Sequence, residues 1–140
     1  MEPSTRTLKC SLVTPEKALL DRVVDFVALP MYDGELGVLP GRAPLIGRLG
    51  PGELRVRRGN ETHRFYVDGG FAQVRDNVVT VLTPRAVPAK DVDANAARQL
   101  LEAALKPGAT PEAQEAQYKN QQRARAQLRI AGQRPEATHA

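Results

Sequence analysis

The stretch GELRVRRGNETHRFYVDGG, residues 52–70, carries the pattern on which the fold of this chain depends. Leu54 and Val56 alternate with charged residues, and after a Gly-Asn pair Phe65 and Val67 alternate in the same way. A period of two places successive side chains on opposite faces of a strand, and a Gly-Asn pair between two such runs is typical of a tight turn. The stretch therefore predicts a β-hairpin with one apolar and one charged face.

The same pattern extends from about residue 7 to about residue 83. In FAQVRDNVVTVLT, residues 71–83, Asp76 and Asn77 separate two further runs. RVVDFVALP, residues 22–30, is apolar almost throughout, which predicts one strand that is buried on both faces. Many short strands with Gly and Pro turns, and no helix between them, predict a β-sandwich of about ten short strands.

A helical pattern replaces the strands near residue 90, where the composition changes to Ala, Gln, Arg and Glu. Asp91 or Asp93 is expected to cap a helix that ends near Leu105. Thr110 is expected to cap a second helix, which begins at Pro111. Because the loop between them is short, the two helices are predicted to form an antiparallel α-helical hairpin.

We therefore expect two domains, a β-sandwich over residues 1–88 and a helical hairpin over residues 89–140 with a frayed tail from about residue 132. The apolar stripes expected on the hairpin consist mostly of alanine: Val92, Ala96, Leu100 and Ala103 or Ala104 on the first helix, and Ala113, Ala116, Ala124 and Leu128 on the second. A buried methyl group contributes roughly 0.8 kcal/mol, against about 1.5 to 3 kcal/mol for a leucine. Such faces dock weakly, so we hypothesise that the hairpin can leave its resting position; a permanently docked cap is the alternative.

Composition excludes several other classes of protein. No apolar run approaches the roughly 18 residues of a membrane helix, so the chain is expected in the cytosol or docked from its cytosolic side. Its single cysteine, Cys10, cannot form an internal disulfide and alternates with Leu8 and Leu12, which predicts a buried thiol. The two histidines, His63 and His139, are too far apart in sequence to suggest a metal site.

The net charge of +4 is distributed unevenly along the chain. Acids and bases are interspersed through residue 90, whereas the segment 118–134 contains bases and no carboxylate. The bases in this segment are Lys119, Arg123, Arg125, Arg129 and Arg134. A basic C-terminal helix is therefore the part of the chain that could bind an acidic partner.

The stretch GELGVLPGRAPL, residues 34–45, is rich in glycine but does not fit a phosphate-binding loop. Such a loop needs a Gly-x-x-x-x-Gly-Lys-Ser/Thr pattern between a strand and a helix. Here Pro40 and Pro44 remove amide donors, and a strand is expected to follow. The residues instead predict a rigid loop with an exposed acidic tip at Asp33 and Glu35.

These residues resemble the loop Gly-Glu-x-Gly-x-x-Pro-Gly-His-x-Pro-Leu of ε subunits of bacterial F-type ATP synthases. The resemblance covers nearly the whole chain, through VTPEKALLD, VDGGFAQVRDNVVTVL, the DVD at the start of the first helix and AQLRIA near the end of the second. It implies a β-sandwich and a helical hairpin in a rotor subunit without catalytic residues. It also implies a peripheral location on the cytoplasmic face of the bacterial plasma membrane.

The resemblance implies particular partners for particular residues. In that family the loop faces the membrane ring of c subunits, which assigns the ring-contacting tip to Asp33, Gly34, Glu35, Leu36 and Gly37. The sandwich joins the γ subunit. The subunit couples rotation to ATP synthesis and in many bacteria inhibits ATP hydrolysis, when the hairpin opens and offers its basic helix to the α and β subunits. The residues that match this basic helix are Lys119, Arg123, Arg125 and Arg129.

Two positions depart from the family pattern. Arg42 stands where the loop usually has histidine, which changes the local charge. Some members bind ATP in the hairpin through a motif Ile/Leu-Asp-x-x-Arg-Ala, and the matching VDANAA keeps Asp93 but has Ala96 at the arginine position. Because alanine cannot pair with a phosphate, we expect no ATP cofactor in the hairpin.

Two other functions compete with this interpretation. A nucleic-acid-binding module would use the Arg-rich helix on phosphates, but the chain has no tryptophan and no evident base-stacking platform. A purely structural β-sandwich adaptor would differ from a rotor subunit mainly in its partners. No nucleophile, base and orienting group occur at a spacing that suggests an enzyme.

Overall fold

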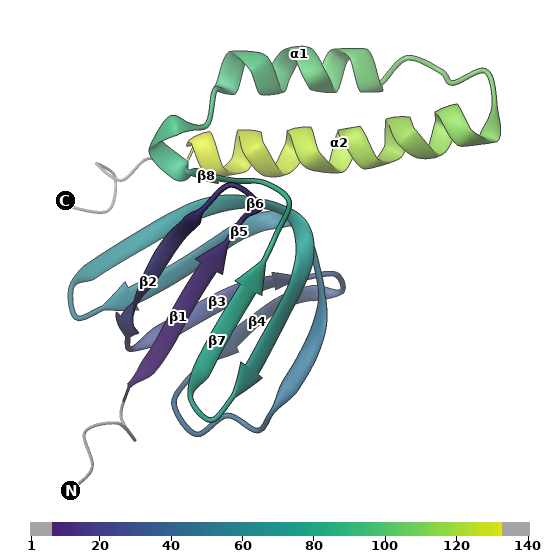
Figure 1. Cartoon of the computed structure of the whole chain (residues 1–140). Coiled ribbons are helices and arrows are strands. Elements are labelled where there is room, and N and C mark those ends of the chain that lie inside the picture. Colours follow the sequence, from purple (N-terminus) through teal and green to yellow (C-terminus); the bar gives the residue numbers. More distant parts are fainter. Residues whose placement is uncertain (1–6, 133–140) are drawn as a thin grey trace, which may run out of the picture. The chain divides into compact units, whose positions relative to one another are not determined.

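The computed structural model describes residues 7–132, which divide into two compact units between Val87 and Pro88. Arg134, His139 and the tail expected past residue 132 lie outside the described residues. The first unit is a β-sandwich, and its eight strands are β1 Leu8–Val13, β2 Ala18–Val24, β3 Phe26–Met31, β4 Gly34–Val38, β5 Leu45–Arg58, β6 Glu61–Arg75, β7 Val78–Leu82 and β8 Ala86–Pro88 (Figure 1).

One continuous sheet folds over to make both layers of the sandwich. Its strand order is β2-β1-β7-β6-β5-β3-β4, with β8 added beside β6. Figure 1 shows β1, β2 and β7 in one layer and β3 and β4 behind them, while β5 and β6 curve from one layer into the other. All pairings along this order are antiparallel except that of β1 with β7.

The described residues contain eight strands where about ten were predicted, because two of them are unusually long. β5 has 14 residues and β6 has 15, and they pair with each other along almost their whole length. Glycines and prolines were expected in general to mark turns between strands, and residues 50–52 and 69–70 contain several of them. They are bends within strands, since Gly69 and Gly70 have φ angles of +80° and +108° while the pairing continues on both sides.

The stretch at residues 22–30 was predicted as one strand and is two. β2 ends at Val24 and β3 begins at Phe26. Asp25 lies between them, where its amide donates to the Arg57 carbonyl and its carboxylate accepts from the Gly59 amide at 2.6 Å. The expected burial on both faces holds within β3, where Val27, Ala28 and Leu29 are all buried.

The core lies between the two layers and consists of the inward members of the alternating patterns. It includes Leu8, Cys10, Leu12, Leu20, Val24, Val27, Leu29, Val38, Leu49, Leu54, Val56, Phe65, Val67, Ala72, Val74, Val79 and Val81. Cys10 is buried as predicted, and this burial, with a smaller effect of the Asp21 carboxylate, raises the pKa of its thiol to about 12. The thiol therefore stays protonated and unreactive at physiological pH.

The second unit is the predicted antiparallel helical hairpin. A short 3-10 turn, η2 Ala89–Asp91, precedes α1 Ala94–Ala104 and α2 Pro111–Gly132. Asp93 caps α1, and its carboxylate accepts hydrogen bonds from the amides of Asn95 and Ala96. Thr110 caps α2 through a bond from the Ala113 amide to its hydroxyl at 3.0 Å.

Some of the alanines expected on the buried stripes face solvent. Ala96 and Ala116 are exposed, whereas Ala97 and Ala104 are the buried residues of α1. The buried residues of α2 are Ala124, Ala126, Ile130 and Ala131. The stripes were shifted because alanine occurs on several sides of both helices, so its spacing alone does not identify one face.

Glutamine side chains of α2 form hydrogen bonds that join the two helices. The Gln117 side-chain amide donates to the carbonyls of Ala103 at 3.3 Å and Lys106 at 3.0 Å, and that of Gln121 donates to Ala104 at 3.0 Å. The last carbonyls of a helix have no partner within it. The two helices are thus joined in part by polar bonds that water can replace.

We predict that Gly70→Ala destabilises the protein by about 3 kcal/mol or more, because a methyl group there overlaps the Leu82 carbonyl oxygen and the φ angle is unfavourable for alanine. Gly59→Ala is the matched control, since Gly59 also has a positive φ but no atom within 4 Å of the added methyl; its cost should be about 1 to 2 kcal/mol. Urea unfolding of the full chain measures both, and equal losses would contradict the assigned bend.

Candidate functional site

The predicted tip, residues 33–37, is a β-hairpin rather than a loop. Gly34–Val38 forms strand β4, which pairs with β3 from Met31 opposite Gly34 to Val27 opposite Val38. Only Asp33, with Tyr32, lies in the turn. The glycines indicated a loop in the sequence, but Gly34 closes a tight turn at a φ of +139°. Gly37, in the strand, leaves space for the neighbouring Phe26 ring.

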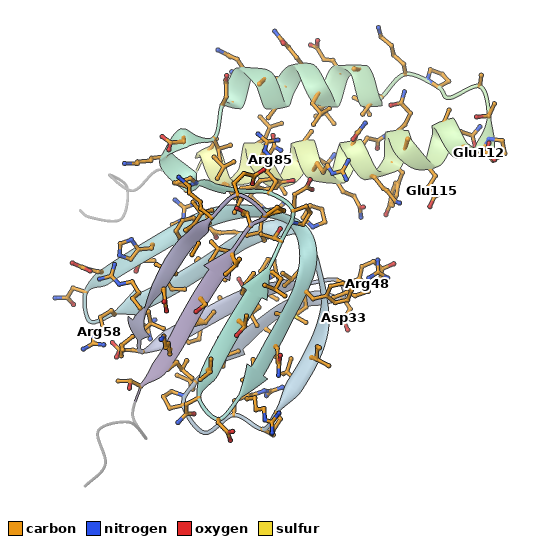
Figure 2. The ribbon with its side chains drawn as sticks, in the orientation of Figure 1. Asp33, Arg48, Arg58, Arg85, Glu112 and Glu115 are labelled. Carbon is orange, nitrogen blue, oxygen red and sulfur yellow. The ribbon has the colours of Figure 1, made fainter. Side chains whose placement is uncertain are left out.

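The tip carries bases as well as the predicted acids. Glu35 forms an ion pair with Arg55 of β5 at 3.2 Å, and Asp33 is exposed in the turn. The guanidinium group of Arg48 lies 4.7 Å from the centre of the Tyr32 ring. Figure 2 shows Asp33 and Arg48 at the same end of the sandwich and Arg58 at the other end. The tip is therefore an exposed mixed-charge hairpin, and within residues 7–132 the carboxylate of Asp33 at its turn forms no ion pair.

The segment between β4 and β5 is tied to a second turn of the sandwich. The Gly41 amide donates to the Asn77 side chain at 2.8 Å, and Asn77 lies in the turn between β6 and β7. The Arg42 amide donates to the Leu39 carbonyl at 3.2 Å, and the Arg42 side chain is exposed. The predicted stiffness of this segment thus comes from hydrogen bonds as well as from its prolines.

An exposed apolar patch, which sequence analysis missed, lies on the outer face of β5, β6 and β7. Its members are Ile46, Phe71, Val78 and Leu82, exposed by 73%, 53%, 39% and 52%. Phe71 is paired directly with Leu82, and Ile46 lies in the next row toward the end of β6. The signal in the sequence was an apolar residue at a polar position of each alternating run, but only the strand register brings these residues together. We call this surface the outer patch.

The four basic residues of α2 do not share one face. Arg125 and Arg129 are four residues apart and exposed on one side, whereas Arg123 lies about 160° around the helix from Arg125. Arg123 is half-buried and donates to the Asn120 side chain at 2.9 Å. Lys119 lies 3.8 Å from Glu115. In the described part of the chain Arg125 and Arg129 form no ion pair, so they are the bases best placed for a partner.

The helix start at Asp93 has a structural role of its own. Its carboxylate accepts two backbone amides of α1, at 2.9 Å and 3.1 Å. Ala96 is exposed and offers only a methyl group at the position of the family arginine. Arg98, the nearest arginine of α1, donates to Asn95 at 2.6 Å. These contacts make Asp93 the N-cap of α1.

Among residues 7–132, no group of three or more His, Cys, Asp and Glu side chains is placed to hold a metal ion. Neither α1 nor α2 is long and apolar enough to cross a membrane.

A β-sandwich with an exposed hairpin tip and an apolar outer patch, joined to a helical hairpin with exposed bases, has the design of an assembly subunit that acts through contacts with other chains. Residues 7–89 match the family model described as ATP synthase, Delta/Epsilon chain, beta-sandwich domain. This chain belongs to the ATP synthase delta/epsilon chain family.

Named relatives narrow the assignment to epsilon chains. The chain is 53% identical over 124 residues to an ATP synthase epsilon chain of Rhodopirellula baltica, covering 88% of this chain and 97% of that one. It is 46% identical over 91 residues to an ATP synthase epsilon chain of Granulibacter bethesdensis, covering 64% and 67% of the two chains.

Two solved structures of ATP synthases contain chains similar to this one. A chain in the Euglena gracilis mitochondrial ATP synthase superposes with a TM-score of 0.70 and 27% identity, covering 96% of this chain and 82% of that one. A chain in the Tetrahymena thermophila mitochondrial ATP synthase has a TM-score of 0.73 and 19% identity, covering 89% and 96%, and at this identity supports the fold alone.

Proposed function

We propose that this chain is a non-catalytic central-stalk subunit of a proton-translocating F-type ATP synthase. It couples the γ subunit and the c-ring to ATP synthesis and restrains ATP hydrolysis through its hairpin. It sits peripherally on the cytoplasmic face of the bacterial plasma membrane, held there by the complex. The observation that carries the proposal is the outer patch, an apolar surface on a sandwich of the epsilon-chain family.

The outer patch is the surface that would bind γ. Ile46, Phe71 and Leu82 are each more than half exposed. A large apolar side chain contributes about 1.5 to 3 kcal/mol when it is fully buried, so three of them supply a substantial part of a stable interface. A few central apolar anchors commonly dominate such interfaces.

The β3–β4 hairpin is the part that would face the c-ring. Its exposed turn at Asp33 is the feature that supports this placement, with Gly34, Glu35, Leu36 and Gly37 in the strand that follows. Because Glu35 is already paired with Arg55, the acid offered to the ring is Asp33, which has no ion pair in the described part of the chain. The proposal therefore assigns the contact to the turn and makes Glu35 a residue that holds the hairpin in place.

The helical hairpin of α1 and α2 is the part that would restrain ATP hydrolysis. Arg125 and Arg129 are exposed, and within the described residues no carboxylate of the chain pairs with them. Opening replaces the glutamine contacts between the helices with water, after which α2 can present these bases to an acidic segment of the α or β subunits. We further propose that ATP does not control this step, since Asp93 is occupied as a helix cap and Ala96 lacks a phosphate-binding group.

A nucleic-acid-binding function is less well supported by the same surfaces. The bases of α2 lie on different sides of the helix, and Lys119 has a carboxylate close by. The outer patch of the sandwich is apolar, and the strand register pairs it with two arginines, Arg48 opposite Phe71 and Arg75 opposite Val78. Non-specific binding to a phosphate backbone needs several bases on one continuous surface.

We predict that Phe71→Asp weakens binding of the full chain to purified γ subunit by about tenfold or more. Leu105→Asp is the matched control, because Leu105 is exposed by 55% and Phe71 by 53%, but Leu105 lies in the helical hairpin. Both positions are exposed, so neither change should alter stability by more than about 0.5 kcal/mol. Wild-type affinity of the Phe71→Asp variant would exclude the outer patch as the γ-binding surface.

We also predict that the double change Arg125→Ala, Arg129→Ala raises ATP hydrolysis by the assembled synthase. Two exposed ion pairs contribute about 0.4 to 2 kcal/mol in total, which corresponds to an increase of about 2-fold to 30-fold in the ratio of active to inhibited enzyme. The effect should shrink at high salt. Arg98→Ala, Lys106→Ala removes the same charge from the other helix and its loop, and should leave hydrolysis unchanged; an equal rise in both variants would contradict a specific role for α2.

A further inference from the structure

A small pocket opens on the sandwich surface, on the layer opposite to the outer patch. It has a volume of about 270 Å³ and is lined by Phe26, Arg55, Arg57 and Thr62. Phe26, Arg57 and Thr62 form one row across three neighbouring strands, since Phe26 pairs with Arg57 and Arg57 with Thr62. Arg55 lies two residues before Arg57 on the same face of β5. The register thus places two guanidinium groups, one hydroxyl and one aromatic ring at one site.

The β3–β4 hairpin fixes both arginines. Arg57 lies over the Phe26 ring, with its guanidinium carbon 4.9 Å from the ring centre. The ring reaches this position because residue 37 is glycine, as a methyl group there would be only 3.1 Å from the ring edge. Arg55 is held by Glu35 at 3.2 Å. The GELG residues therefore position the two cations as well as forming the tip.

The charges at the pocket favour an anion. Arg57 forms no ion pair within residues 7–132, and its ring contact leaves the edge of the guanidinium group available for hydrogen bonds. The carboxylates closest to the pocket in sequence have other partners: Asp25 accepts the Gly59 amide, Glu53 pairs with Arg64, and Glu61 pairs with Arg22. Glu35 neutralises one guanidinium group, which leaves Arg57 as the uncompensated charge.

We propose that this pocket binds a phosphate group, either as inorganic phosphate or as part of a nucleotide. Guanidinium groups match the geometry of phosphate oxygens and bind them through two parallel hydrogen bonds, and a threonine hydroxyl supplies a further donor. The Phe26 ring offers an apolar surface beside them. This site is in the sandwich, so it is separate from the helix start at Asp93 and independent of the proposed rotor function.

The test is a titration of isotope-labelled full-length protein with sodium phosphate at constant ionic strength, followed by amide NMR. We expect saturable shifts at Phe26, Arg57 and Thr62. Arg57→Gln should weaken binding by about tenfold or more, because it removes a charge-assisted contact. Arg58→Gln is the matched control, since Arg58 is the next residue, is also exposed and does not line the pocket; it should change affinity by less than about twofold.

A Gly37→Ala variant tests the positioning of Arg57 without changing any charge, and it should also weaken phosphate binding. A second arm replaces phosphate with ATP: tighter binding at the same amides identifies a nucleotide as the source of the phosphate group, and equal or weaker binding identifies free phosphate. Three results would each overturn the proposal. They are an equal loss of phosphate affinity in Arg57→Gln and Arg58→Gln, amide shifts confined to the helical hairpin, and shifts that do not saturate with phosphate concentration.

Discussion

The bend of β5 and β6 is the constraint on which the rest of this structure depends. The two strands are long enough to run through both layers, but only because Gly69 and Gly70 adopt positive φ angles and the Leu82 carbonyl can approach Gly70 closely. This bend encloses the core between the layers. It also assigns the two halves of each strand to different outer faces, so the outer patch and the arginine pocket are made from the same pair of strands.

The helical hairpin is held together by other interactions than the sandwich. Its helices are joined by alanine contacts and by hydrogen bonds from Gln117 and Gln121 to carbonyls of α1. Alanine burial contributes little per residue, and a glutamine bond to a helix end can be exchanged for water at small net cost. A rigid sandwich with its own core can hold a fixed position in a rotor, while a loosely closed hairpin can change its contacts without unfolding the domain that carries it.

Patterns in the sequence predicted the features that depend only on residues close together in the chain. The turns at residues 59–60 and 76–77, the burial of Cys10 and the cap at Thr110 depend on neighbouring residues and were predicted correctly. For the first helix the sequence left Asp91 and Asp93 as alternatives, and the structure shows Asp93 as the cap. The strand count was wrong because a glycine bend and a glycine turn look the same in sequence. The outer patch and the arginine pocket were missed because each is assembled by strand register between residues far apart in the chain.

Cysteine crosslinking in the assembled synthase tests the central claim most directly. The buried, protonated Cys10 should not react, so single cysteines introduced at Asp33 and Arg125 report their own neighbours. The account predicts that Asp33→Cys crosslinks to a c subunit and that Arg125→Cys crosslinks to γ or to an α or β subunit when hydrolysis is inhibited. A product between Asp33→Cys and α or β, with none to the ring, would contradict the assignment of the β3–β4 hairpin as the tip of a rotor subunit.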